Sequence, residues 1–280
     1  MDVSLKRWFS LLALTLVLGC FPAWAGPYAP AAGTPGTTAI PKDSAAFVAW
    51  AAGWENFVMG AELDPAYADP AKALGPAEGN SLDVVSLGRA GEITLVFAPF
   101  SDGPGWDFAV FENGFSDTFL ELARVEVSSD GVNFARFPAT SLTAAPVSAF
   151  GALDPTDVDG LAGKYRQGYG TPFDLSDLAA APLVAAGTVD LSAITRVRII
   201  DVVGDGSQKD SSGRPIYDPY PTTGSAGFDI DAVGVSGGAS YPVGTYTPPP
   251  APAQSGSAGI GDEGGCFLGT AWGASLPGKP

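Results

Sequence analysis

The segment that most constrains the fold is 106–137, WDFAVFENGFSDTFLELARVEVSSDGVNFARF, which reads as three short strands joined by two loops. Two of these strands, 122–128 and 132–137, flank Ser129-Asp130-Gly131, and an Asp-Gly turn between β-prone runs is a strong hairpin signal. The segment therefore predicts antiparallel neighbours, and both of its loops carry carboxylates or amides.

Short strands are expected elsewhere as well. The chain of 280 residues contains 37 glycines and 25 prolines, a balance that suits many short strands joined by tight turns. Segments 82–87 and 92–97 flank a four-residue connection and predict a second hairpin, while 194–203 and 228–235 predict two late strands. We therefore expect an all-β fold, a jelly-roll β-sandwich with long loops.

One segment, 43–58, predicts an N-terminal amphipathic helix. Asp43 or Ser44 can cap it, and apolar residues then recur at steps of three and four. Such spacing places the side chains on one buried stripe, so we interpret them as core residues rather than as a sugar-binding surface. They are Phe47, Trp50, Ala51, Trp54 and Val58.

The two ends of the chain differ from its middle. Residues 1–25 read as a signal peptide, with Lys6 and Arg7 before an apolar run and an Ala-x-Ala cleavage site at 23–25. The alternative is a lipoprotein leader with Cys20 as the lipidated residue. We expect an exposed lead-in at 26–42, the β-sandwich domain at 43–246, a Pro/Ser/Gly linker at 247–262 and a Cys-containing tail at 263–280. This organisation predicts an extracellular or cell-surface protein without a membrane span in the mature chain.

Charge and composition exclude several function classes. The formal net charge of −16 argues against nucleic acid or an anionic membrane as the partner, because both require basic patches. The chain has no histidine, which excludes Ser-His-Asp and Cys-His catalysis and any His-ligated metal. Carboxylate chemistry remains possible.

Carboxylates at strand ends predict a calcium site. In the strand at 106–113, Glu112 continues the apolar row of Phe108 and Val110, and Asp201 ends a similar row in the strand at 194–203. The strand at 228–235 is expected to place two further aspartates on one face, together with Val233 and Val235. Such acids repel one another unless a cation lies between them, and Ca²⁺ takes six to eight oxygen ligands. The alternative is that these acids cap turns. The candidate ligands are Glu112, Asn113, Asp201, Asp205, Asp229 and Asp231.

Two tyrosines are candidates for ligand binding. Tyr217 and Tyr220 lie in a proline-flanked loop, IYDPYP, which can present aromatic rings for stacking on a sugar. The alternative is that the rings close over the end of the sandwich.

Several motifs carry a resemblance. The segments VEVSSDGVNFARF, ITRVRIIDV and FDIDAVGV resemble the discoidin or coagulation-factor type C class of galactose-binding-like β-sandwiches. A second set resembles uncharacterised bacterial secreted or cell-surface proteins over about residues 45–236; its segments are DFAVFENGF, VEVSSDGVNF, DVDGLAGK, GYGTPFDL, VGDGS and YDPYPTTGSAGFDIDAVGV. The tail GGCFLGTAW is similar to a Gly-rich segment, CFIATAAYG, near the end of exported bacterial proteins, which implies modification at or near Cys266; a free thiol is the alternative.

Three functions remain after these observations. The first is a non-catalytic, calcium-stabilised surface module that binds a glycan or another surface protein. The second is a carboxylate-based hydrolase or lyase acting on extracellular polysaccharide, for which two carboxylates would suffice. The third is a purely structural surface component.

Overall fold

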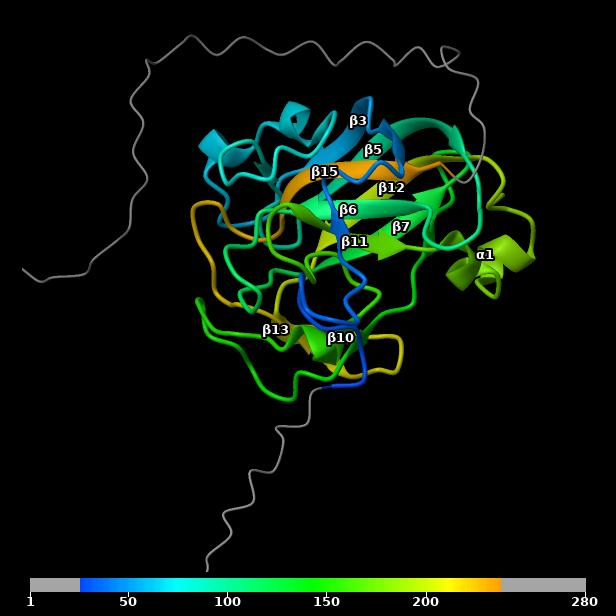
Figure 1. The fold of residues 1–280 in the computed structure, drawn as a ribbon. Coiled ribbons are helices and arrows are strands. Elements are labelled where there is room, and N and C mark those ends of the chain that lie inside the picture. The colour runs from blue at the N-terminus through cyan, green and yellow to red at the C-terminus, as the bar shows by residue number, and fades with distance from the viewer. Residues whose placement is uncertain (1–25, 238–280) are drawn as a thin grey trace, which may run out of the picture. The chain divides into compact units, whose positions relative to one another are not determined.

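A computed structural model describes residues 26–237 of the chain (Figure 1). The predicted signal peptide with Cys20, the predicted linker at 247–262 and the tail with Cys266 lie outside the described residues. Within the described residues, none of the helices has the length and apolar character needed to cross a bilayer.

Two antiparallel sheets form the main body of the structure. The first has the strand order β1-β11-β6-β15-β2, and β4 pairs with β15 as well. Its strands are β1 (Ile40–Pro41), β2 (Phe47–Trp50), β4 (Val85–Ser86), β6 (Phe108–Glu112), β11 (Tyr169–Phe173) and β15 (Asp229–Ser236).

The second main sheet has the order β3-β5-β12-β7-β8. Its long central strands pair over many residues, and β12 is antiparallel to both β5 and β7. The predicted hairpin around Asp130-Gly131 is confirmed, because β7 and β8 pair across that turn. The strands are β3 (Gly53–Val58), β5 (Glu92–Phe100), β7 (Ala123–Ser128), β8 (Ala135–Arg136) and β12 (Ile194–Asp201).

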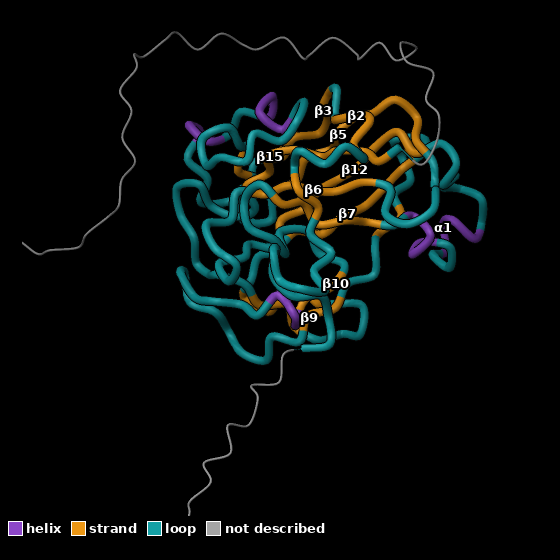
Figure 2. Tube along the Cα trace, viewed as in Figure 1, coloured by secondary structure: helices purple, strands orange, loops and turns teal. Residues whose placement is uncertain are grey.

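Loops and turns, drawn in teal in Figure 2, make up much of the rest of the described residues. Several small elements lie among them. Two short ribbons and one short α-helix lie outside the main sheets. The ribbons are β9 (Thr140–Ser141) with β10 (Val158–Asp159) and β13 (Asp205–Lys209) with β14 (Pro215–Tyr217), and the helix is α1 (Pro182–Ala185). Turns of 3₁₀ helix span Pro65–Tyr67, Pro70–Ala73, Pro155–Asp157 and Leu175–Leu178.

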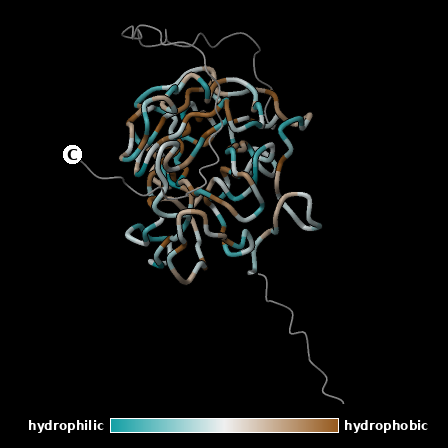
Figure 3. Tube along the Cα trace, turned by 90° about the vertical axis from the view of Figure 1, so that its left-hand side faces the viewer, coloured by the Kyte–Doolittle hydropathy of each residue, from teal (hydrophilic) through white to brown (hydrophobic). Residues whose placement is uncertain are grey.

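The main hydrophobic core takes side chains from both sheets. Phe108 and Val110 of β6 and Val125 and Val127 of β7 all belong to it and are at most 1% exposed. Hydrophobic and hydrophilic residues alternate at short intervals along the chain (Figure 3), as expected where one face of a strand is buried. The fold is therefore all-β, as predicted.

The predicted helix at 43–58 is wrong. The segment forms β2 and β3, which lie at the edges of different sheets and pair with β15 and β5 respectively. Each pairing contains a register shift in which one extra residue is inserted, so residues three apart share a face. Phe47 and Trp50 therefore contact each other with ring centroids 4.6 Å apart, and Trp54 and Phe57 both pack on the main core. These two bulges explain why the apolar residues of this segment recur at the three-residue spacing that is typical of a helix.

A bulge also corrects the predicted faces of the strand at 228–235. Asp231 is the extra residue between the pairs Ile230–Glu112 and Ala232–Phe111. Beyond the bulge the alternation is inverted, so Val233 lies in the main core with Ile230 instead of sharing a face with the aspartates.

The predicted hairpin around residues 88–91 is wrong as well. The strand before this turn, β4, pairs with β15, whereas the strand after it, β5, belongs to the other sheet. The connection therefore crosses between the sheets. Its local turn is real, since Gly91 N–H donates to the Gly88 carbonyl at 2.9 Å, but a turn alone does not decide which partner a strand takes.

The predicted lead-in at 26–42 lies along the domain. Gly26 N–H donates to Thr156 Oγ1 at 2.6 Å, and the hydroxyls of Thr38 and Tyr165 lie 2.7 Å apart. Its last residues form β1, which adds an edge to the first sheet beside β11.

Candidate metal centre

Five buried carboxylates gather at one end of the two main sheets. They come from segments far apart in the sequence, and each is at most 6% exposed. Antiparallel pairing brings them together, because β6 and β12 end where β7 and β15 begin. They are Glu112 at the end of β6, Glu121 before β7, Asp201 at the end of β12, Asp218 after β14 and Asp229 at the start of β15. We call them the carboxylate cluster.

One part of the cluster lies at the junction of β6 and β15. Glu112 Oε2 accepts a hydrogen bond from Gly114 N–H at 2.7 Å, and Asp229 Oδ2 accepts one from the Asn113 side-chain amide at 3.2 Å. Asn113 is itself 4% exposed. Neighbouring residues 113 and 114 therefore each donate to one of these two carboxylates.

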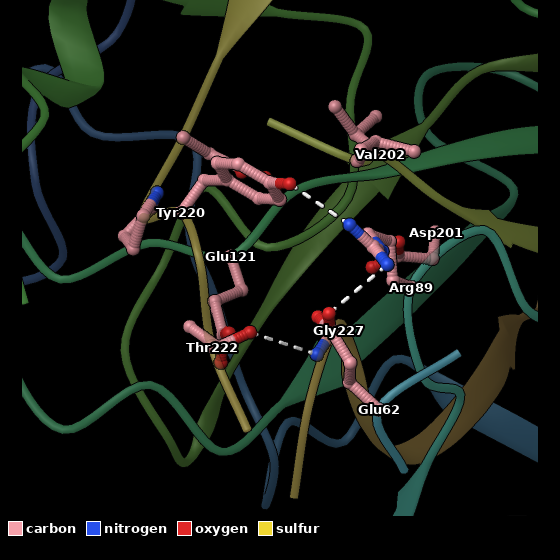
Figure 4. Close-up of a pocket in the computed structure, with 11 residues that line it drawn as sticks. Glu62, Arg89, Glu121, Asp201, Val202, Tyr220, Thr222 and Gly227 are labelled. Atoms are coloured by element: carbon pink, nitrogen blue, oxygen red, sulfur yellow. Dashed lines mark hydrogen bonds and ion pairs between the residues drawn. The ribbon is translucent and has the colours of Figure 1, made fainter. Parts of the chain in front are cut away.

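The other part surrounds a small cavity. Glu121, Asp201 and Asp218 line a cavity of about 10 Å³, with Arg89 and Tyr220 at its edge (Figure 4). Such a volume is close to the minimum for one water molecule and suits a small ion.

Backbone amides orient the cavity aspartates. Asp201 accepts from Ala90 N–H and Phe228 N–H, both at 2.8 Å, and Asp218 Oδ2 accepts from Leu122 N–H at 2.9 Å. The turn between β4 and β5 thus positions Asp201.

Burial raises the pKa of every carboxylate in the cluster. Burial raises the pKa of Asp201 and of Asp229 to about 7 despite the hydrogen bonds that they accept. The pKa of Glu112 lies well above its ordinary value because of burial and the charge of Asp229, and burial and the charge of Asp201 do the same to the pKa of Asp218. Burial is also the largest cause of the raised pKa of Glu121, and the charges of Asp229, Glu112, Asp218 and Asp201 raise it further. Without a cation, these groups disfavour their charged forms.

Three oxygens of the cluster have no hydrogen-bond partner. They are Glu112 Oε1, Glu121 Oε1 and Asp229 Oδ1, all inaccessible to solvent. A buried carboxylate oxygen without a donor is costly, and such atoms are uncommon in native proteins. Each of these three oxygens is free to coordinate a cation.

Four of the six predicted ligands lie in or beside the cluster. Glu112, Asn113, Asp201 and Asp229 are brought together, although they are separated by up to 117 positions in the sequence. Asp205 is not part of the cluster, because it is exposed and its Oδ1 accepts from Ser207 N–H at 2.8 Å. Asp231 points to the loop at 78–79, whose two N–H groups donate to it at 3.0 and 2.8 Å.

Sequence reasoning missed Glu121 and Asp218. Glu121 stands between Leu120 and Leu122, both fully buried, and a lone carboxylate inside an apolar run is a signal that it needs a partner. Asp218 stands in a proline-flanked loop, IYDPYP, where an aspartate commonly caps a turn. Its role depends on long-range contacts, such as the bond to Leu122 N–H, that no local pattern reveals.

The two predicted ligand-binding tyrosines are half-buried. The Tyr217 ring lies so close to Gly206 that a Cβ there would come within 2.3 Å of it. The Tyr220 hydroxyl accepts from Arg89 at 2.8 Å, and Arg89 is also 3.0 Å from Glu62, as Figure 4 shows. Both rings thus contact neighbouring residues of the domain, and their stacking on a sugar stays a prediction.

Other aromatic rings are far more exposed. Phe115 is 64% and Phe150 88% exposed, and both lie nearly parallel to Phe119, with centroids 5.4 and 6.3 Å from it. Phe115 and Phe119 belong to the loop that begins at Glu112 and ends at Glu121. We call these three rings the aromatic ladder.

A second acidic group lies elsewhere in the fold. Asp102, Asp107 and Asp174 bring three carboxylate oxygens within 4.8 Å of one another, and among the described residues no other acidic group does so. The carboxylates of the cluster are therefore spaced more widely. Both oxygens of buried Asp107 already accept bonds, from Gly103 and Leu175 N–H, so this group leaves no buried oxygen of Asp107 unpaired.

Comparisons with protein-family models, with curated proteins and with solved structures find no match to this chain.

Proposed function

We propose that this protein is an exported or cell-surface, non-catalytic binding module that is stabilised by calcium. The observation that carries the proposal is the set of three unpaired, inaccessible oxygens on Glu112, Glu121 and Asp229. A cation at the carboxylate cluster would supply the missing partners and offset the mutual repulsion of five acids.

Calcium suits these residues better than other metals. The cluster offers carboxylates and, in Asn113, an amide oxygen, and oxygen ligands are those of Ca²⁺ and Mg²⁺. Mg²⁺ requires near-ideal octahedral geometry, whereas Ca²⁺ tolerates irregular shells of six to eight oxygens. A loosely spaced set of carboxylates therefore favours Ca²⁺.

The size of the cavity argues against a hydrolase that uses these acids. A volume of about 10 Å³ does not admit a sugar ring, and the carboxylates are buried. Glycosidases need two carboxyl groups that flank a bound glycosidic bond. The cluster is better suited to holding ions.

The finer fold that we propose is a galactose-binding-like jelly roll. Support comes from the two five-stranded antiparallel paths, β1-β11-β6-β15-β2 and β3-β5-β12-β7-β8, and from the core that they share. In the first path, neighbours in space are distant in sequence, as crossovers between sheets require.

The aromatic ladder is the surface that we propose for recognition of a glycan or of another surface protein. Phe115 and Phe150 are exposed, and both are nearly parallel to Phe119. Phe115 and Phe119 lie on the loop whose two ends, Glu112 and Glu121, belong to the cluster. Exposed aromatic groups of this kind often mark interaction sites.

The calcium part of the proposal is tested by thermal unfolding. In chelator-treated full-length protein, calcium at about 100 times its dissociation constant adds about 2.7 kcal/mol of stability, which raises Tm by roughly 5–10 °C in a domain of this size. Excess chelator reverses the rise. Asp205→Asn is the matched control, because Asp205 lies outside the cluster, and it keeps the full response. An unchanged melt, with no metal in the purified protein, contradicts the proposal.

The recognition part is tested by a glycan array probed with the full chain in calcium. We expect retained glycans whose binding is lost in Phe150→Ser, while Tyr67→Ser, which removes another exposed ring (47% exposed), binds as the wild type does. Binding that survives Phe150→Ser would place the recognition surface elsewhere, and an array without any signal would favour a surface-protein partner or a structural role.

A further inference from the structure

Gly26, the first described residue, is held by the turn that precedes β10 (Figure 1). Gly26 N–H donates to Thr156 Oγ1 at 2.6 Å, and Tyr28 N–H donates to the Thr156 carbonyl at 3.1 Å. Thr156 is itself only 6% exposed. A single buried residue therefore binds the start of the lead-in through both its side chain and its backbone.

The surroundings of the Gly26 nitrogen are acidic. The Thr156 hydroxyl donates to Asp154 Oδ1 at 2.6 Å, so the oxygen that accepts from Gly26 is polarised by a carboxylate. A second carboxylate lies against Gly26, because a Cβ on this residue would come within 2.4 Å of Asp157 Oδ1. Burial and the charge of Asp154 raise the pKa of Asp157. A positive charge at the Gly26 nitrogen would stabilise both carboxylates.

Glycine is the residue that fits at position 26. A Cβ there would also come within 2.2 Å of the Thr156 carbonyl oxygen, closer than real contacts allow. The Ala-x-Ala pattern of the predicted leader places its requirement on residues 23 and 25, before the cleavage position. The glycine that follows is explained by its fit against the folded domain.

The lead-in that begins at Gly26 covers buried groups of the domain. The Tyr28 ring centroid lies 5.8 Å from Nζ of Lys164, which is 4% exposed, and the Thr38 hydroxyl lies 2.7 Å from that of Tyr165. A contact that fixes the start of this segment therefore also keeps these groups covered.

We propose that the 154–157 turn is a binding site for the α-ammonium group that removal of the leader creates at Gly26. Hydrolysis of the bond between residues 25 and 26 by a leader peptidase adds water across that bond. It leaves a carboxylate on residue 25 and an amine on Gly26, and the amine takes up a proton. The inference rests on the export in the proposed function and is independent of calcium.

Cleavage changes what the Gly26 nitrogen offers to the turn. The amide of the uncleaved chain has one N–H and no charge, whereas the ammonium has three N–H donors and a positive charge. One donor keeps Thr156 Oγ1, and a second serves the Asp157 carboxylate beside it. Charge-assisted bonds of this kind are stronger than neutral ones. Removal of the leader thus fastens the lead-in to the domain.

Thermal unfolding of two chains with different first residues tests the proposal. The processed chain, 26–280, is compared with 23–280, in which Ala-Trp-Ala precedes Gly26 and carries the ammonium three residues away. A protease releases each from a fusion partner with no other residue attached. We expect the Tm of 26–280 to be about 2–4 °C higher, the effect of one charge-assisted contact at a partly buried site.

Asp157→Asn separates the effect of charge from that of fit. It should lower the Tm of 26–280 by about 2–4 °C and leave that of 23–280 nearly unchanged, because only the first chain places an ammonium beside it. Asp43→Asn, at an exposed aspartate of the same lead-in region, is the matched control and should preserve the difference between the two chains. If Asp157→Asn does not fold, the difference between the unsubstituted chains in about 1 M salt decides, since screening should reduce it.

The first residue of the exported protein, read by intact mass and N-terminal sequencing, tests the cleavage. Gly26 in first place supports the inference. A lipidated Cys20 in first place overturns it and leaves the surface module standing, whereas a retained leader without export overturns both.

The remaining outcomes concern the ammonium site alone. Equal Tm values for 26–280 and 23–280 overturn it, as does an Asp157→Asn loss that is the same in both chains or a difference that salt does not reduce. None of these results bears on the calcium response of Tm, which tests the proposed function separately.

Discussion

Lys164 is a single residue whose burial couples protonation to stability. It is 4% exposed, its Nζ donates to the Val158 carbonyl at 2.7 Å, and Nζ lies 5.8 Å from the ring centroids of Tyr28 and Tyr165. Burial lowers the pKa of Lys164 to about 8, and the charge of Asp159 opposes this shift only in part. The native state therefore holds the proton less tightly than the unfolded state.

The lowered pKa of Lys164 predicts a pH-dependent gain from its removal. Below pH 8 the group is charged in both states and its burial destabilises the fold, by at most about 3 kcal/mol. Above about pH 10.5 it is neutral in both states and this cost disappears. Urea unfolding should therefore find the stability of Lys164→Met, relative to wild type, falling as pH rises from 8 to 10.5.

Lys72→Met is the matched control for this prediction. Lys72 Nζ makes an equivalent bond, to the Leu82 carbonyl at 2.7 Å, but on the surface. The stability of Lys72→Met relative to wild type should not change over the same pH range. A parallel trend in the two variants would contradict the role of burial.

At the scale of single residues, the sequence identified part of the candidate site. Glu112 and Asp201 could be selected because each ends an alternating apolar row, and the structure places both in the carboxylate cluster. Asp205 could not be distinguished from them, because a loop aspartate that caps a turn has the same local sequence as one that points inward. The role of these residues as ligands stays a prediction.

At the scale of the element, strands could be predicted better than their partners. Alternation identified β5, β6, β7, β12 and β15 within a few residues, because period-two burial is local. The bulges in β2, β3 and β15 could not be predicted, since each depends on the strand that pairs with it. Asn56 in β3 has a φ of 51°, a conformation stabilised by tertiary context.

Cross-strand charge pairing yields a prediction for the second sheet. Glu126 of β7 is 4% exposed and bonds to Arg136 of β8 and Arg198 of β12, which lie directly opposite it in the pairing. Its removal leaves both guanidinium groups without their buried partner. We expect Glu126→Ala to lower the free energy of unfolding by about 2–3 kcal/mol in a denaturant titration.

Glu55→Ala is the control for Glu126→Ala. Glu55 of β3 pairs with Arg196 of β12 at 2.8 Å, but its side chain is 31% exposed, so the loss should stay below about 1 kcal/mol. Equal losses in the two variants would show that burial does not govern these pairs.

At the scale of the whole molecule, the carboxylate cluster joins segments that no continuous sheet connects. It links the ends of β6 and β12 with the loop after β14 and the starts of β7 and β15. The opposite end of the domain, with α1 and the 129–134 turn, holds the second acidic group, in which both oxygens of buried Asp107 already accept backbone bonds. The turn is held by its own contacts, including Asp130 Oδ1 accepting from Val132 and Asn133 N–H at 2.8 Å. Ion binding should therefore stabilise one end of the fold selectively.

Hydrogen exchange of the full chain, with calcium and with chelator, tests this selectivity. Chelation should raise exchange at 112–122, 201–204 and 218–229, because repulsion among the cluster acids is then no longer offset and these segments open locally. The 129–134 turn should exchange equally in both conditions and serves as the internal control. A uniform change across both regions would mean that calcium acts on global stability alone, and no change at the cluster segments would contradict its placement there.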